Sequence, residues 1–245
     1  MTSYGIISVR TASSRLPEKC LFNFGDNFGE VNVLQHVIRR AKHFGFTPVV
    51  ATTTLREDDI VAEIAQREEA LCFRGSAEDK LQRWLDACNQ FGIHKFVTLD
   101  GDDLFFAPDL AYRGLELLDI ADIVYPSSHI YVGSFSFALT RDIVERACEL
   151  KDSGETEMMW HFIEKVPDVK QTKMDYKGTP VNFRLTLDYP EDYWMLDTVR
   201  RILGCLAERK EIEDLFWNNF NLHEVNWFRN ADMKRGHEVG GSGLF

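Results

Sequence analysis

The sequence predicts an α/β protein built around a mostly parallel, doubly wound sheet. Short apolar runs bounded by turn residues recur along the chain, as buried strands do. Stretches with a helical spacing of apolar residues separate them. Strands that alternate with helices are joined by right-handed crossovers, which makes neighbouring strands parallel. The strands are expected at 4–9, 48–52, 70–73, 95–99, 120–125 and 183–187.

Each predicted helix carries one apolar stripe that would cover a face of this sheet. In the first helix Val33, Val37 and Ala41 share such a stripe. The last helix follows Pro190, because proline is favoured in the first helical turn. The helices are expected near 33–41, 60–65, 81–88, 141–150, 157–163 and 193–203.

Length and composition favour one large domain. The chain has 245 residues, of which 44% are hydrophobic and 27% charged, so it can bury a sizeable core. We expect a single domain over residues 1–235. Residues 236–245 include four glycines and little to pack, which predicts a flexible C-terminal tail.

The charge of the chain restricts its partners. A formal net charge of −11 would repel nucleic acid or anionic lipid at long range, so a phosphate ligand must meet a local basic pocket.

The five cysteines lack the paired spacing of zinc or redox motifs, which favours a reducing compartment. No signal peptide is recognised, and no run approaches the roughly 20 apolar residues that a membrane span needs. We expect a cytoplasmic protein with neither nucleic acid nor membrane as a partner.

A cationic loop follows the first predicted strand. It places Arg10, Arg15 and Lys19 beside Ser13 and Ser14. Cationic side chains and free backbone N–H groups can neutralise phosphate oxygens and stabilise departing pyrophosphate. A single arginine here would suit a solvated polar loop, but three cations directly after a buried strand favour binding of a triphosphate. No Walker loop or GxGxxG motif elsewhere competes for that role.

Carboxylates follow two other predicted strands. Asp100 and Asp102 come after the strand at 95–99, and Asp188 ends the run at 183–187. Ligands bind at the carboxyl ends of such strands, and Mg²⁺ usually takes one or two protein carboxylates plus substrate phosphates. The alternatives are a turn for the first cluster and a helix N-cap for Asp188. Together with the cationic loop, Asp102 and Asp188 predict a magnesium site.

Two further segments are weaker candidates for contact with a ligand. Ser76 and Asp79 resemble a capping box with Asp in place of Glu or Gln. The preceding Gly75 allows close backbone approach to a base or ribose. In the predicted helix at 157–163, Glu157 and His161 share a face, although packing by its Met and Trp side chains is the favoured role.

In these residues the chain resembles the cytidylyltransferase family that includes the CMP-sialic acid and CMP-Kdo synthetases, most closely the spore-coat polysaccharide branch. The resemblance covers about residues 4–205, and the stretch 10–19 is similar to the family's Ala-Arg-x-x-Ser-x-Arg-Leu-Pro-x-Lys loop. It implies a Rossmann-like, GT-A-like nucleotidyltransferase fold with a small acceptor and dimerisation region at about 126–180. It also implies Mg²⁺-dependent transfer of CMP from CTP to a sugar acid or phosphorylated acceptor, and a homodimer with a contact at 127–137.

The resemblance also implies roles for individual residues. Arg10, Arg15 and Lys19 would hold the triphosphate, and Asp102 and Asp188 the Mg²⁺. Near the acceptor it implies Tyr131, Glu157 and His161. The residues implied near the nucleotide are Val9, Ser13, Ser14, Thr52, Arg74, Gly75, Ser76, Asp79, Arg83 and Asp100.

Two other functions fit parts of the same pattern. A metal-dependent GT-A glycosyltransferase could use Asp100-Gly101-Asp102 as an Asp-x-Asp motif that holds a nucleotide-sugar. A non-catalytic, nucleotide-binding regulatory protein is favoured by Glu18, which adds a negative charge to the loop where relatives usually have Gly. Release of pyrophosphate from CTP would separate the cytidylyltransferase from both.

Overall fold

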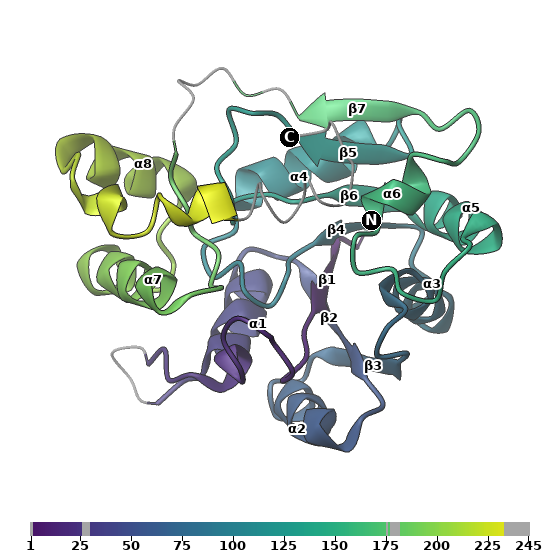
Figure 1. Ribbon diagram of the computed structural model, residues 1–245, viewed down its shortest axis with the longest axis horizontal. Coiled ribbons are helices and arrows are strands. Elements are labelled where there is room, and N and C mark those ends of the chain that lie inside the picture. Colours follow the sequence, from purple (N-terminus) through teal and green to yellow (C-terminus); the bar gives the residue numbers. More distant parts are fainter. Residues whose placement is uncertain (1, 26–29, 175, 177–181, 233–245) are drawn as a thin grey trace.

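The computed structural model describes residues 2–25, 30–174, 176 and 182–232 (Figure 1). Its strands are β1 (Tyr4–Ser8), β2 (Thr47–Thr53), β3 (Leu71–Gly75), β4 (Lys95–Thr98), β5 (Ile123–Pro126), β6 (Ala138–Thr140) and β7 (Gln171–Met174). Its α-helices are α1 (Val33–His43), α2 (Asp59–Arg67), α3 (Lys80–Phe91), α4 (Pro108–Leu117), α5 (Arg141–Leu150), α6 (Trp160–Ile163), α7 (Pro190–Leu203) and α8 (Arg209–Asn218). Short 3₁₀ helices are η1 (Lys19–Leu21), η2 (Arg56–Asp58) and η3 (Leu222–Val225).

The strands form one sheet in the order β3-β2-β1-β4-β6-β5-β7. All neighbours are parallel except at β6, which is antiparallel to both β4 and β5. The predicted α/β fold with a mostly parallel sheet is therefore confirmed. The tail expected at 236–245 lies outside the described residues.

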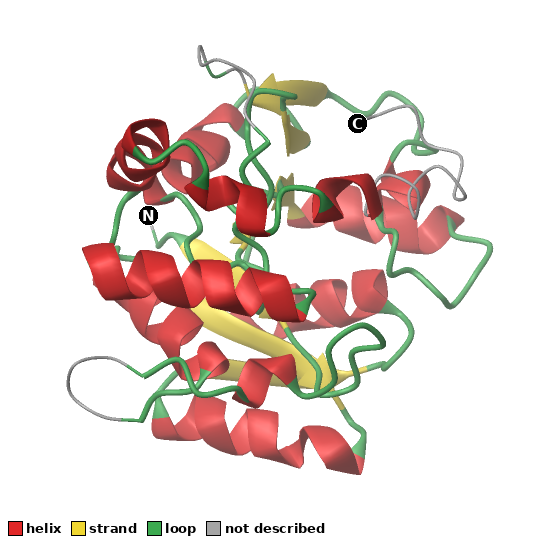
Figure 2. Ribbon diagram, turned by 60° about the vertical axis from the view of Figure 1, so that its left-hand side comes forward, coloured by secondary structure: helices red, strands yellow, loops and turns green. Residues whose placement is uncertain are grey.

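Helices cover both faces of the sheet (Figures 1 and 2). Alternate residues of a strand point to opposite faces, so Ile7 and Val50 enter one core while Ile6 and Val49 enter the other. The first core is closed by α1, α2, α4, α7 and α8, and the second by α3, α5 and α6. Among the helices of the described chain, none has both the length and the apolar composition that a bilayer crossing requires.

The strand expected at 183–187 is not part of the sheet. This segment is extended, but it makes only an isolated bridge between Arg184 and Val132. Its backbone amides donate hydrogen bonds to two different segments: Leu185 donates to the carbonyl of Val132, and Leu187 donates to that of Asp102. A strand needs consecutive hydrogen bonds to one neighbouring strand, so no strand forms here. In its place the sheet contains β6 and the polar edge strand β7, which the apolar pattern did not predict.

The helix expected at 157–163 is shortened to α6, and Glu157 lies before it. The cause is Thr156, which is fully buried. Its hydroxyl donates to Asp79 at 2.9 Å and accepts from the amide of Leu81 at 2.9 Å, which holds the chain against the start of α3. Glu157 and His161 therefore do not share a helical face. Helices α4 and α8 were not predicted.

Asp79 is the N-cap of α3. Its carboxylate accepts from the amide of Gln82 at 3.0 Å and forms an ion pair with Lys151. Burial by itself would raise the pKa of Asp79, but Lys151, Gln82 and Thr156 hold it below its ordinary value of 3.8. The charged form is thus favoured in the folded state. Its contribution to stability is present above pH 3.8 and is lost as the pH falls through the lower, folded pKa.

We expect Asp79→Asn, which keeps a capping oxygen but loses the charge, to lower the free energy of unfolding by about 1 kcal/mol at pH 7. The difference from the parent protein should shrink as the pH falls below about 4. Urea unfolding at pH 7, 4 and 3 measures it. Asp152→Asn is the matched control, because Asp152 is exposed and lies 3.6 Å from Lys165. An equal deficit for Asp79→Asn at every pH would contradict the role of the charge.

Candidate active site

The carboxyl ends of β1 and β4 face a cavity of about 420 Å³. Segments far apart in the sequence contribute to it, because a parallel sheet brings the ends of its strands to one edge. Its lining includes the predicted residues Val9, Arg10, Ser13, Ser14, Arg15, Lys19, Arg83, Asp100, Asp102, Glu157 and Asp188. The cationic loop and both groups of carboxylates therefore meet in one place.

Lys19 links the two groups of carboxylates in this cavity. Its ammonium nitrogen lies 2.5 Å from Oδ2 of Asp102 and 2.9 Å from Oδ1 of Asp188. It also donates to the carbonyl of Leu187 at 2.7 Å. The guanidinium of Arg15 contacts the same Oδ1 of Asp188 at 2.7 Å. Two cations of the loop and two separated carboxylates thus form one network.

The electrostatics of the network favour its charged forms. Burial would lower the pKa of Lys19, but the carboxylates of Asp102 and Asp188 outweigh burial and raise it above its ordinary value. Burial would likewise raise the pKa of Asp188, but Lys19 and Arg15 lower it. Both groups are therefore charged at neutral pH, and Lys19 can neutralise phosphate without giving up its proton.

A buried network behind the cavity positions Asp188. Arg184, whose side chain is fully buried, donates to Oδ2 of Asp188 at 2.9 Å and to Asp192 at 2.9 Å and 3.1 Å. The carboxylate of Asp192, also fully buried, accepts from the amides of Asp188 and Tyr189. Asn226, beyond η3, donates to Asp192 at 2.9 Å. Sequence reasoning missed this network, although the charges at 184, 188 and 192 recur at helical spacing.

A second buried carboxylate positions the cationic loop. Asp58 accepts from the amide of Thr11 at 2.7 Å and from its hydroxyl at 2.8 Å. It also accepts from the hydroxyl of Thr53 at the end of β2. Because Thr11 lies between Arg10 and Ser13, these bonds fix the path of the loop directly after β1. Nothing in the local sequence pattern around Asp58 indicated this contact.

Asp100 lines the cavity beside a lysine that was not predicted. The carboxylate of Asp100 is 3.6 Å from the ammonium of Lys80, the first residue of α3. Burial raises the pKa of Asp100, and the charges of Asp102 and Glu157 add to this against the effect of Lys80. The helix dipole disfavours a cation in the first turn of a helix, so the position of Lys80 was a sequence signal that it serves a purpose other than helix stability. Gly101 lies between Asp100 and Asp102. A Cβ at this position would lie 2.9 Å from that of Val9, so glycine lets the backbone of this turn lie close to the chain that follows β1.

Five residues predicted near the nucleotide do not line this cavity: Thr52, Arg74, Gly75, Ser76 and Asp79. Arg74 is used structurally, since it donates to the carbonyls of Thr53 and Leu55. Ser76 accepts from the amide of Asp79, as in the predicted capping arrangement. The buried hydroxyl of Thr52 has no hydrogen-bond partner among the described residues.

A second cavity of about 350 Å³ adjoins the first. The two share Lys80, Asp100, Glu157 and Trp160 as lining residues. Tyr131, predicted at the acceptor, lines the second cavity, whereas His161 lines neither. Five of the eleven residues at 127–137 are buried and one is exposed, and nine of them line the second cavity.

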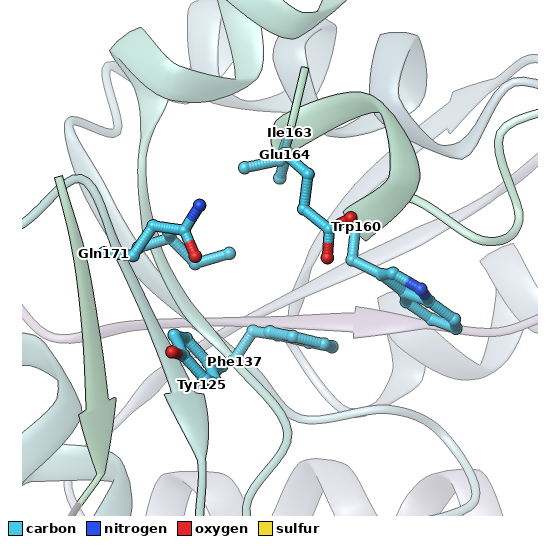
Figure 3. Close-up of a pocket in the computed structure, with 7 residues that line it drawn as sticks. Tyr125, Phe137, Trp160, Ile163, Glu164 and Gln171 are labelled. Carbon is cyan, nitrogen blue, oxygen red and sulfur yellow. The ribbon is translucent and has the colours of Figure 1, made fainter. Parts of the chain in front are cut away.

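Aromatic rings form a wall of the second cavity. Phe137 and Trp160 stack with their ring centroids 6.3 Å apart and their planes at 20°. The same two rings also line a small cavity of about 20 Å³, which Tyr125, Glu164 and Gln171 help to enclose (Figure 3). A cavity of that size holds about one water molecule, so of the two cavities that these rings line, the second is the one with room for a ligand.

The sheet order and the meeting of cationic and acidic side chains in one cavity agree with a nucleotidyltransferase, and the comparisons with known proteins support this class of enzyme. Residues 4–119 match the model of the family described as cytidylyltransferase. The resemblance to the cytidylyltransferase family that was inferred from the sequence is thus confirmed.

The chain is also similar to individual proteins over most of its length. An uncharacterised protein of Methanocaldococcus jannaschii is 28% identical over 98% of this chain and 99% of its own length. The spore coat polysaccharide biosynthesis protein SpsF of Bacillus subtilis is 25% identical over 84% of this chain and 88% of its own. A solved cytidylyltransferase from Leptospira borgpetersenii has a TM-score of 0.82 at 24% identity, covering 91% of this chain and 97% of that one. This last likeness establishes the fold.

Proposed function

We propose that this enzyme transfers CMP from CTP to a small sugar-derived or phosphorylated acceptor, with release of pyrophosphate. The observation that carries the proposal is the meeting of Lys19 and Arg15 with Asp102 and Asp188 in one cavity. The cytidylyltransferase family match supports CTP as the donor. The similarity to a spore coat polysaccharide protein supports a role in making precursors of surface polysaccharides.

In the proposed reaction, an oxygen of the acceptor attacks the α-phosphorus of CTP while the bond to pyrophosphate breaks. Such transfers are accelerated by positioning and by charge neutralisation. Arg10, Arg15 and Lys19 would bind the phosphates and balance the charge that develops on the leaving pyrophosphate. Because Lys19 keeps its proton, it serves as a fixed positive charge.

Asp102 and Asp188 suit a magnesium ion that is bound together with the triphosphate. Their carboxylate oxygens converge on one cation, the Lys19 ammonium, which lies within 2.9 Å of both. In the part of the chain that is described, no group of three or more His, Cys, Asp or Glu side chains could hold a metal by itself. Two carboxylates plus phosphate oxygens are the usual surroundings of Mg²⁺ in such sites. When bound, the ion would neutralise phosphate charge during transfer.

The second cavity is the proposed acceptor site. It adjoins the nucleotide cavity through Lys80, Asp100 and Glu157, so a molecule bound there reaches the transferred phosphorus. Tyr131 and Glu157 would contact the acceptor, and the Trp160 ring, which lines this cavity, would pack against it. A homodimer stays a prediction, which sedimentation of the purified protein would check.

The test is pyrophosphate release from CTP in the presence of Mg²⁺ and a panel of sugar acids and sugar phosphates. A glycosyltransferase that uses nucleotide-sugars would release none. We expect Lys19→Met to slow the release by about a hundredfold, because a preorganised charge on the phosphates is lost. Lys210→Met is the control, since Lys210 is 80% exposed on α8. Full activity of Lys19→Met would contradict the assignment of the cavity.

A further inference from the structure

The two cavities of the site meet at a junction. Four of the described residues line both of them: Lys80, Asp100, Glu157 and Trp160. The acceptor oxygen in the second cavity has to reach the α-phosphorus of CTP in the first, so the α-phosphate belongs at this junction during the transfer. Among these four residues Lys80 is the one cation. Its ammonium is therefore placed where the donor and the acceptor meet.

Lys80 and Lys19 are equally buried but differ in their hydrogen bonds. Each side chain is 13% exposed. The ammonium of Lys19 donates to two carboxylates and to a backbone carbonyl, which uses its three N–H donors. The ammonium of Lys80 donates no hydrogen bond to a described residue, and its one ion pair there, with Asp100, spans 3.6 Å. A buried ammonium without hydrogen bonds costs free energy unless a ligand or water accepts them, so Lys80 is able to bind an anion in the cavity.

The first turns of α3 hold Lys80 at the junction in its charged form. The ammonium lies 5.1 Å from the centre of the ring of Trp84, which lies one helical turn further on and also lines the second cavity. Burial by itself would lower the pKa of Lys80, but the carboxylates of Asp100 and Glu157 outweigh burial and raise it above its ordinary value. The side chain is thus a fixed positive charge at neutral pH. A phosphate oxygen can replace the distant carboxylate of Asp100 as its partner.

We propose that Lys80 is a catalytic residue that donates hydrogen bonds to the non-bridging oxygens of the α-phosphate while CMP is transferred. This inference rests on the proposed function, which supplies the donor and the reaction. A bond forms between the acceptor oxygen and the α-phosphorus, and the bond from that phosphorus to pyrophosphate breaks, with its electron pair leaving on pyrophosphate. A hydroxyl acceptor releases its proton to water, and Lys80 keeps its own. Its charge stabilises the α-phosphate oxygens in the transition state.

Binding of CMP and CTP tests this contact without an acceptor, because CMP carries the α-phosphate alone. We expect Lys80→Met to weaken the binding of both nucleotides about tenfold by calorimetry, since both lose a charge-assisted hydrogen bond to the same phosphate. Lys19→Met should weaken CTP more than CMP, because Lys19 is assigned to the phosphates that leave. The ratio of the two affinities therefore distinguishes the two lysines.

Turnover tests the catalytic role. At saturating CTP and Mg²⁺, Lys80→Met should lower kcat for pyrophosphate release by about a hundredfold. Lys80→Arg keeps the charge and should bind CMP within about threefold of the parent protein. Lys95→Met is the control, because Lys95 is partly buried on β4 but lines neither cavity. Should Lys80→Met fail to fold, Lys80→Gln removes the same charge.

Three binding results would overturn the proposal: CMP binding by Lys80→Met within about twofold of the parent, a loss for CTP about tenfold larger than that for CMP, or no saturable CMP binding to the parent up to about 10 mM. A kcat for Lys80→Met within about threefold of the parent would also overturn it. A failure of the proposed function would instead appear as absent pyrophosphate release in a protein whose CMP binding still depends on Lys80. The two failures are therefore distinguishable.

Discussion

Replacing Asp102 by asparagine should lower kcat for pyrophosphate release by about a thousandfold. Asp102 is one of two carboxylates that share the Lys19 ammonium, and the proposed magnesium ion needs both. The amide keeps the shape of the side chain but removes its charge. Steady-state release of pyrophosphate at saturating CTP and Mg²⁺ measures the loss.

The fold should survive this change. The side chain of Asp102 is 26% exposed, and Lys19 keeps its contact with Asp188 after the substitution. We therefore expect a circular dichroism spectrum and Tm close to those of the parent protein. Asp119→Asn is the control, because Asp119 is 78% exposed and pairs with Lys95 away from the cavity. A kcat for Asp102→Asn within about tenfold of the parent would show that Asp102 holds no essential ligand.

Replacing Asp192 by alanine should have the largest effect on stability. Arg184 would keep a fully buried guanidinium with one of its two carboxylate partners removed. The amides of Asp188 and Tyr189 and the side chain of Asn226 would also lose an acceptor. Breaking a buried ion pair in this way costs about 3–5 kcal/mol. For a chain of this length that corresponds to a fall in Tm of about 10 °C.

Urea unfolding and calorimetry measure this change. Asp214→Ala is the matched control, because Asp214 also pairs with a cation four residues away but is 59% exposed, and its loss should cost no more than about 0.5 kcal/mol. Asp192→Asn should fall between the two, since the amide can still accept hydrogen bonds. A loss below 1 kcal/mol for Asp192→Ala would contradict the role of the buried network.

The sequence predicted the first five strands of the sheet well because they are apolar runs between turn residues. It missed β6, whose three residues are too few for a pattern, and β7, whose exposed edge lets it be polar. The extended segment at 183–187 was assigned to the sheet because it is equally apolar. Its burial comes from packing against the 131–134 turn, where a Cβ on Gly133 would lie 2.4 Å from the backbone of Leu185. Burial alone does not distinguish a strand from such a segment.

The centre of the candidate site was also predictable from sequence. Arg15, Lys19 and Asp102 follow strand ends, and parallel strands bring those ends together. Asp188 follows the extended segment at 183–187, where the amide of Leu187 bonds to the carbonyl of Asp102 and so brings Asp188 to the same cavity. Lys80 was not predicted, because it is the first residue of a helix. Its position beside Asp100 depends on how α3 packs against the sheet, which no local sequence pattern shows.

By itself, the sequence determined the class of fold, the cationic loop and the two aspartates, since these follow from apolar periodicity and from charges placed directly after apolar runs. Only the tertiary structure decided that Asp192, Arg184 and Asn226 hold Asp188, and that the second cavity extends to β7. Contacts between residues distant in sequence depend on packing in three dimensions. The sequence shows which side chains are available for such contacts, but which of them contact one another depends on the fold.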